Sequence, residues 1–137
     1  MTPSPLQLEH NFFAKVSIEA NKAFDARAVD ESGLDPSLQV DIKLSQHNTE
    51  KQRYQLVLKL DRPVQAEVAK HIPSLISLEV VGFFKVDEAF QAQPDSENKL
   101  RVNGASLLYS AARENISMIT SRGPYGVYLL PTLSFQS

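Results

Sequence analysis

Apolar and polar residues alternate along three stretches of this sequence, residues 12–19, 38–44 and 54–60. A period of two places every second side chain on the same face of a strand. Each stretch therefore predicts a strand with one buried face and one wet face. The second and third stretches flank a short polar run at residues 46–52. Two strands on either side of such a run predict a β-hairpin.

A fourth strand is predicted at residues 75–86, and it differs from the others because it is apolar on parts of both faces. Apolar residues on both faces of a strand indicate that both faces are covered. We expect the core to cover one face and a partner to cover the other. Gly82 lies inside this stretch and predicts a bulge or a bend.

A long helix is predicted near the C-terminus, and an apolar tail reaching Phe135 follows it. Asn103 is a favourable N-cap residue, while Gly123 before Pro124 is typical of a helix end. A shorter helical turn is predicted at residues 88–90. Apolar and small side chains recur in the long helix at the spacing of one helical face: Leu107, Leu108, Ala111, Ala112, Asn115, Ile116 and Ile119.

The order of these elements predicts a single α+β domain over residues 1–137, with about four antiparallel strands packed with one long C-terminal helix. One helix cannot cover four strands and also keep its own second side wet. Part of the fourth strand and part of the helix are therefore left as uncovered apolar surface, for which oligomerisation is the expected use. The candidate interface residues are Leu107, Leu108, Ala111, Ala112, Arg113 and Met118.

Composition and charge exclude several classes of protein. The sequence has no Cys, so disulfides and thiolate chemistry are excluded. Its net charge of −2 gives no basic surface for nucleic acid. No apolar run approaches the ~20 residues of a membrane span. Residues 1–10 lack the basic and then apolar order of a signal peptide. We therefore expect a cytoplasmic protein.

The residues that usually carry chemistry are scattered. His10, His47 and His71 lie far apart in the sequence and are expected to be surface residues. The acidic loop at residues 30–35 lacks the spacing of a calcium-binding loop. The five glycines form no phosphate-binding motif. We expect no catalytic site, no metal and no cofactor, and a small-ligand or enzymatic domain is the least supported alternative.

Two short motifs in the long helix are spaced so that their arginines lie nine positions apart. The spacing, and the apolar stretch that follows it, resemble the SecB-like export chaperones. The order of the strands is also similar to that family, including a first strand at residues 6–20 that ends in an aliphatic residue followed by Glu-Ala. The matching helix and tail residues are Ala112-Arg113-Glu114, Ser121-Arg122-Gly123, Pro131 and Phe135.

This resemblance implies an ATP-independent holdase that assembles as a homotetramer, a dimer of dimers with helices sandwiched between sheets. It also implies that unfolded preproteins are bound and delivered to the SecA motor. Apolar contacts suit such a function because they are non-directional and tolerate many sequences. The candidate client-binding residues are Phe24, Ile76, Leu78, Val80, Phe83 and Phe84. Core packing for Ile76, Leu78 and Val80, and local loop packing for Phe24, are the alternatives.

Two departures from the family concern the SecA partner. Typical members carry further acids on the motor-binding face, whereas here Glu19 keeps one acidic position and Lys15 and Ser77 replace others. Typical members also continue past the terminal Phe, and this sequence ends at Ser137. Both changes are expected to weaken electrostatic docking of SecA. The alternative function is a SecB-like module dedicated to one partner, for example an antitoxin, without SecA handoff.

Overall fold

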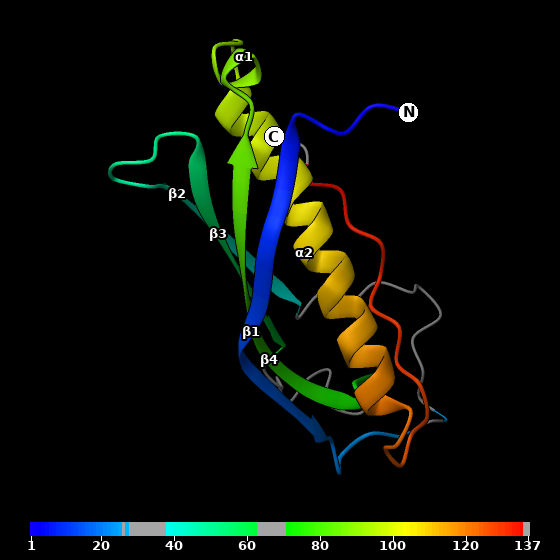
Figure 1. The fold of residues 1–137 in the computed structure, drawn as a ribbon. Coiled ribbons are helices and arrows are strands. Elements are labelled where there is room, and N and C mark those ends of the chain that lie inside the picture. The colour runs from blue at the N-terminus through cyan, green and yellow to red at the C-terminus, as the bar shows by residue number, and fades with distance from the viewer. Residues whose placement is uncertain (26, 28–37, 63–70, 136–137) are drawn as a thin grey trace.

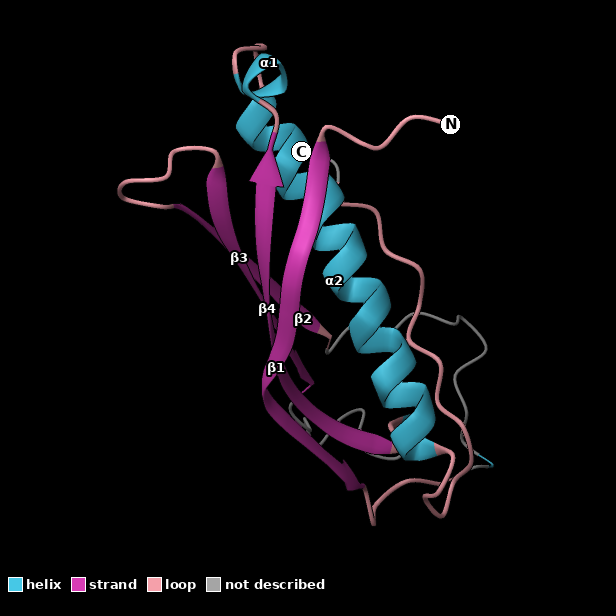
Figure 2. Cartoon of the chain, viewed as in Figure 1, coloured by secondary structure: helices cyan, strands magenta, loops and turns pink. Residues whose placement is uncertain are grey.

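The computed structural model describes residues 1–25, 27, 38–62 and 71–135. An antiparallel sheet is packed on one face by a long helix (Figures 1 and 2). This confirms the predicted α+β fold class. The elements are strands β1 (Leu6–Ala20), β2 (Gln39–Gln46), β3 (Arg53–Arg62) and β4 (Ser74–Val86), the short helix α1 (Glu88–Gln91) and the long helix α2 (Ser96–Thr120).

The strand order β1-β4-β3-β2 places β4 and β3 at the centre of the sheet and leaves β1 and β2 at its edges. The predicted hairpin is formed by β2 and β3, in which Ile42 lies opposite Leu58. Every neighbouring pair of strands is antiparallel. Since residues opposite one another share a face, the sheet has a helix-facing side and an outer side.

The core lies between the sheet and α2. Leu56, Leu58 and Leu60 of β3 are fully buried, as is Leu108 of α2. A Cβ built at Gly82 would lie 2.8 Å from Cδ2 of Leu108, so the glycine lets the helix approach the strand closely. The pairing of β4 with β3 continues without a shift through Gly82. The predicted bulge at Gly82 is therefore wrong, and the register shifts lie in β1 instead.

Helix α2 begins at Ser96, after the N-cap residue Asp95, which lies eight residues before the predicted cap. Asn103 lies inside the helix and donates Nδ2 to the carbonyl of Lys99. The buried stripe of the helix continues through Leu100, which is 1% exposed. The first two turns look polar in the sequence because six of the eight residues 96–103 are polar or charged. The C-cap residue is Ser121, two positions before the predicted end.

The tail, residues 125–135, follows the turn after α2 and runs back beside the helix (Figure 1). Leu130 is fully buried, and Tyr128, Leu133 and Phe135 pack against the core. The ring of Phe135 meets the ring of Tyr109 edge-on, with 5.6 Å between centroids. The tail therefore covers one flank of α2.

Candidate functional site

The helix-facing side of β2 is an apolar row that α2 only partly covers. Val40, Ile42 and Leu44 lie opposite Leu60, Leu58 and Leu56 of β3. Those β3 leucines are fully buried, whereas all three β2 residues are half-buried. Leu38 precedes the strand and is also half-buried. The same face of the sheet is thus sealed over β3 and open over β2.

A cleft lies at one end of this row. It has a volume of about 630 Å³ and is lined by Leu44 and Tyr54 from the hairpin and by residues 95–98 and Arg101 at the start of α2. The far edge of β2 has no neighbouring strand among the described residues. An extended chain could therefore reach apolar side chains and unpaired strand amides at the same place.

Sequence reasoning missed this row because its alternation is the same as that of a fully covered strand. The alternation predicts which face of β2 is apolar but not whether the helix reaches that strand. The only sequence signal is that β2 begins directly after a long connection, residues 21–36, which leaves it free to lie at a sheet edge.

Most of the predicted client-binding residues lie in the core. Ile76, Leu78, Val80 and Phe84 are between 0% and 3% exposed beneath α2. A client cannot reach them in this conformation, so their assignment to client binding is corrected to core packing. The physical reason is the central position of β4, since a strand between two neighbours is covered by the helix on one face and by outer-face side chains on the other.

Phe24 packs locally. Its ring meets the ring of Tyr125 edge-on, with 4.8 Å between centroids. The Tyr125 hydroxyl donates to the carbonyl of Asn21, at 3.0 Å. The contact joins the end of β1 to the start of the tail, which corresponds to the local-packing alternative.

Phe83 lies on the outer side of the sheet in an aromatic cluster with His10 and Phe12. The rings of Phe83 and His10 are nearly parallel, with an interplanar angle of 8° and 6.2 Å between centroids. Phe12 is 42% exposed and contacts both rings. A pocket of about 340 Å³ beside the cluster is lined by His10, His47, Gln55 and Phe83, among others. The fold thus places two histidines from distant parts of the sequence beside one pocket.

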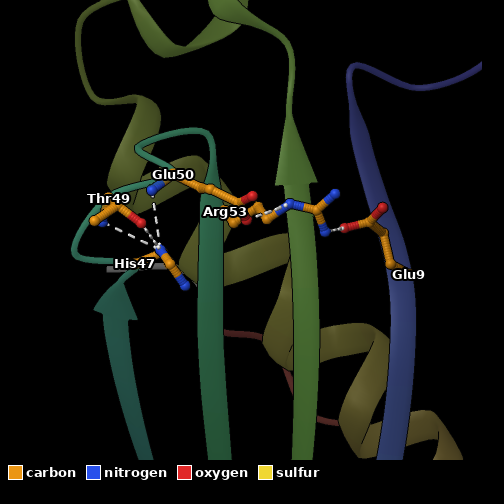
Figure 3. A network of polar contacts seen from close by, with 5 residues as sticks. All are labelled: Glu9, His47, Thr49, Glu50 and Arg53. Atoms are coloured by element: carbon orange, nitrogen blue, oxygen red, sulfur yellow. Dashed lines mark hydrogen bonds and ion pairs between the residues drawn. The ribbon is translucent and has the colours of Figure 1, made fainter.

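A polar network forms the rim of this pocket (Figure 3). Arg53 donates Nη1 to Glu9 of β1 and Nε to Glu50 of the hairpin turn. His47 Nδ1 accepts hydrogen bonds from the backbone amides of Thr49 and Glu50, at 3.2 and 2.9 Å. The network ties the turn of the hairpin to the opposite edge strand.

The predicted interface residues of the helix fall on different faces. Leu108 and Ala112 are fully buried against the sheet, so they are corrected to core residues. Arg113, which was predicted at the interface, donates Nε to the carbonyl of Leu130 in the tail, at 3.0 Å.

The remaining three interface residues form a stripe on the side of α2 away from the sheet. Leu107 is 47% exposed and Met118 is 65% exposed. Ala111 lies between them and is half-buried. The stripe is compatible with the predicted interface, which nothing in the single chain tests.

The outer side of the sheet carries mixed charge. Glu79 of β4 lies between Lys15 of β1 and Lys59 of β3 in the register. Glu19 is exposed and lies opposite Leu75. Positive and negative side chains thus alternate across these three strands, and among the described residues no continuous acidic patch surrounds Glu79.

Within the described ranges, no group of three His, Asp or Glu side chains is placed to hold a metal ion. The helices in the same ranges include none that is long and apolar enough to span a membrane. The apolar row of β2 and the strand edge beside it suit the binding of an extended polypeptide.

Comparison with protein families finds a match over residues 2–137 to the family described as "Preprotein translocase subunit SecB". Comparison with curated proteins finds no match. Among solved structures, the chain is similar to a SecB-like chaperone of Mycobacterium tuberculosis in complex with a peptide from the HigA1 antitoxin. The TM-score is 0.55 at 13% identity, over 94% of this chain and 88% of that chain.

The chain is also similar to a protein of unknown function from Streptococcus agalactiae. The TM-score is 0.53 at 13% identity, over 94% of this chain and 96% of that chain. At such identity the two structures show a shared fold and nothing about ligands.

Proposed function

This chain belongs to the SecB family, and from that premise we propose that it is an ATP-independent holdase that binds unfolded chains and keeps them from aggregating. Its function is of the chaperone type, and the family is not enzymatic. We further propose that it works in the cytoplasm as a homotetramer, a dimer of dimers.

The half-open apolar row of β2 carries the proposal. Val40, Ile42 and Leu44 offer a continuous apolar strip beside a cleft. Apolar burial contributes ~25 cal/mol per Å² without regard to direction, so it tolerates different client sequences. The unpaired edge of β2 adds main-chain hydrogen bonds, which also ignore client side chains. Both features suit an extended, unfolded client.

The exposed stripe of α2 supports the oligomer. Leu107 and Met118 place large apolar side chains in water on the side of the helix away from the sheet. A second copy placed against this stripe would bury it and sandwich the helices between two sheets. Light scattering measures the mass directly, and a monomer at working concentration would contradict this part of the proposal.

The holdase is tested with a chemically unfolded reporter diluted into buffer at one reporter per protomer. We expect slower aggregation and a complex that survives gel filtration without ATP. Unchanged aggregation together with no complex would contradict the proposed function. A folded reporter of the same sequence is the control, since a holdase should ignore it.

The mixed outer face favours a second candidate, a SecB-like module dedicated to one partner without SecA handoff. Glu79 lies between two lysines, which leaves little negative potential for a basic motor segment. Co-purification followed by stoichiometry separates the two candidates. A single partner at constant ratio supports the dedicated module, whereas many clients at low occupancy support the general holdase.

A further inference from the structure

Side chains of α2 hold the tail by hydrogen bonds to the backbone of the tail. Tyr109 donates its hydroxyl to the carbonyl of Pro131, at 2.6 Å, and Arg113 donates Nε to the carbonyl of Leu130. At the other end, Ser117 donates to the carbonyl of Tyr128, at 3.4 Å.

Thr120 completes this set: its Oγ1 accepts a hydrogen bond from the backbone amide of Tyr128, at 2.9 Å. Its hydroxyl proton goes to the carbonyl of Ile116. Residues 109, 113, 117 and 120 are three or four positions apart, so they form one row along α2. The row presents about one polar side chain per helical turn to the tail.

Such a row recognises an extended backbone rather than a sequence. Residues four apart on a helix are separated by about 6 Å, and two extended residues span about 6–7 Å. An extended segment running antiparallel to α2 can therefore bring about every second carbonyl to the row. Among the aliphatic side chains of the tail, the groove selects mainly at Leu130, which is fully buried. Val127 and Leu129 are each 64% exposed, so the groove places little restriction on them.

The tail is tied to the rest of the fold through side chains. Between described residues, no backbone–backbone hydrogen bond joins residues 125–135 to the sheet. Its attachment rests on the contacts with α2 and on the buried Leu130. The ring of Tyr128 also lies 4.5 Å from the guanidinium of Arg62 in β3, and the Tyr125 hydroxyl donates to the carbonyl of Asn21. A segment held in this way opens at lower free energy than a strand inside a sheet.

We propose that the flank of α2 occupied by the tail is also a binding groove for client. The occupant would be an extended segment with a large aliphatic residue for the Leu130 site and an aromatic residue for Tyr109. The tail is then a built-in competitor that the client displaces. This inference rests on the proposed holdase function, because it names a site and a control for the same activity.

The covalent link makes the tail a strong competitor. A segment joined by a short turn to its own groove acts at an effective concentration in the millimolar range. A client binds only to the fraction of molecules in which the groove is open, and its apparent affinity falls in proportion. The factor is the same for every client, so only segments with a high intrinsic affinity for the groove reach high occupancy.

The test uses the full chain and a fluorescent peptide with the sequence of residues 125–135. Leu130→Ala weakens the tail in its own groove, so the peptide should bind this variant at least about tenfold more tightly than the parent chain. Leu129→Ala removes the same side chain from an exposed neighbouring position and should stay within about twofold of the parent. An unfolded reporter should displace the peptide.

Equal peptide affinity for the parent and Leu130→Ala chains would overturn the proposal. So would a reporter complex that leaves the peptide bound. If no reporter binds any variant while the tenfold difference in peptide affinity remains, the holdase function fails and the groove stands.

A second measurement applies if Leu130→Ala does not fold. The sequence has no Cys, so Ser134→Cys provides a single labelling position in the exposed part of the tail. Fluorescence anisotropy of this label should fall when unfolded reporter binds, because the released tail moves more freely. If the anisotropy stays unchanged in a chain that has bound reporter, the proposal that the client displaces the tail is wrong.

Discussion

Gly82 of β4 lies directly against Leu108 of α2, since a Cβ at Gly82 would be 2.8 Å from Leu108 Cδ2 and 3.1 Å from Phe84 Cε2. Contact at 2.8 Å forces a neighbouring side chain to move. The absence of a side chain at this position therefore determines how closely the helix lies on the sheet.

Gly82→Ala should lower the free energy of unfolding by about 1–3 kcal/mol, the usual cost of overpacking a filled core. Urea unfolding measures the change. Leu108→Ala removes the atoms that would clash and costs about 2–5 kcal/mol alone. The double variant should then lose less than the sum of the two single losses. Simple additivity would show that Leu108 is not the obstacle.

The fold followed from the sequence where one local rule acted alone. Two-residue alternation predicted the β2–β3 hairpin, and the helical spacing of apolar residues predicted the helix over residues 107–119. The rules failed at the start of α2, where the buried Leu100 lies among mostly polar residues at 96–103, so the sequence shows no apolar face there. Gly104 follows, and it allows the helix to approach Leu56, since a Cβ there would lie 2.9 Å from Leu56 Cδ2.

Four of the predicted client-binding residues lie in the core for a related reason. Apolar residues on both faces of β4 were interpreted as partner surface, but they reflect its central position, where Val81 on the outer side is only 6% exposed. The open surface lies over Ile42, whose pattern is the same as that of a covered strand. Which strand a single helix covers is decided by strand order, and strand order is not encoded in alternation.

Ile42→Ser should reduce client capture by roughly three- to tenfold, because a lost apolar contact of about 1 kcal/mol corresponds to that range. Suppression of reporter aggregation over a titration of chaperone gives the measurement. Lys43→Ser changes the next residue, which faces the outer side, and should leave capture unchanged. Equal losses in both variants would indicate that the row of β2 is not the client surface.

Met118→Asp should dissociate the oligomer, since it would bury an unpaired carboxylate in the proposed interface at a cost of several kcal/mol. Sedimentation or light scattering gives the mass. Ser110→Asp adds the same charge at an exposed position of α2 outside the stripe and should leave the mass unaltered. An intact tetramer in the Met118 variant would place the interface elsewhere.

Arg53→Gln should cost no more than about 1 kcal/mol of stability, because its partners Glu9 and Glu50 are partly exposed and surface ion pairs contribute little. The difference from the parent chain should narrow as salt is raised, since salt screens exposed charges. Lys85→Gln removes a neighbouring positive charge and is the control. A loss that does not respond to salt would mean that Arg53 acts through packing instead.

Glu19→Lys should leave client holding within about twofold of the parent, because Glu19 is exposed on the outer side of the sheet, away from the apolar row of β2. Any affinity for SecA should fall more than the affinity for clients. The contact with SecA depends on negative charge, and a lysine at position 19 would repel a basic segment that Glu19 attracts. Aggregation suppression and SecA affinity at two salt concentrations measure the two effects. Glu19→Gln, which removes the charge without reversing it, should give an intermediate SecA affinity. Equal loss of holding and of SecA binding would contradict the separation of the two faces and would point to unfolding of β1.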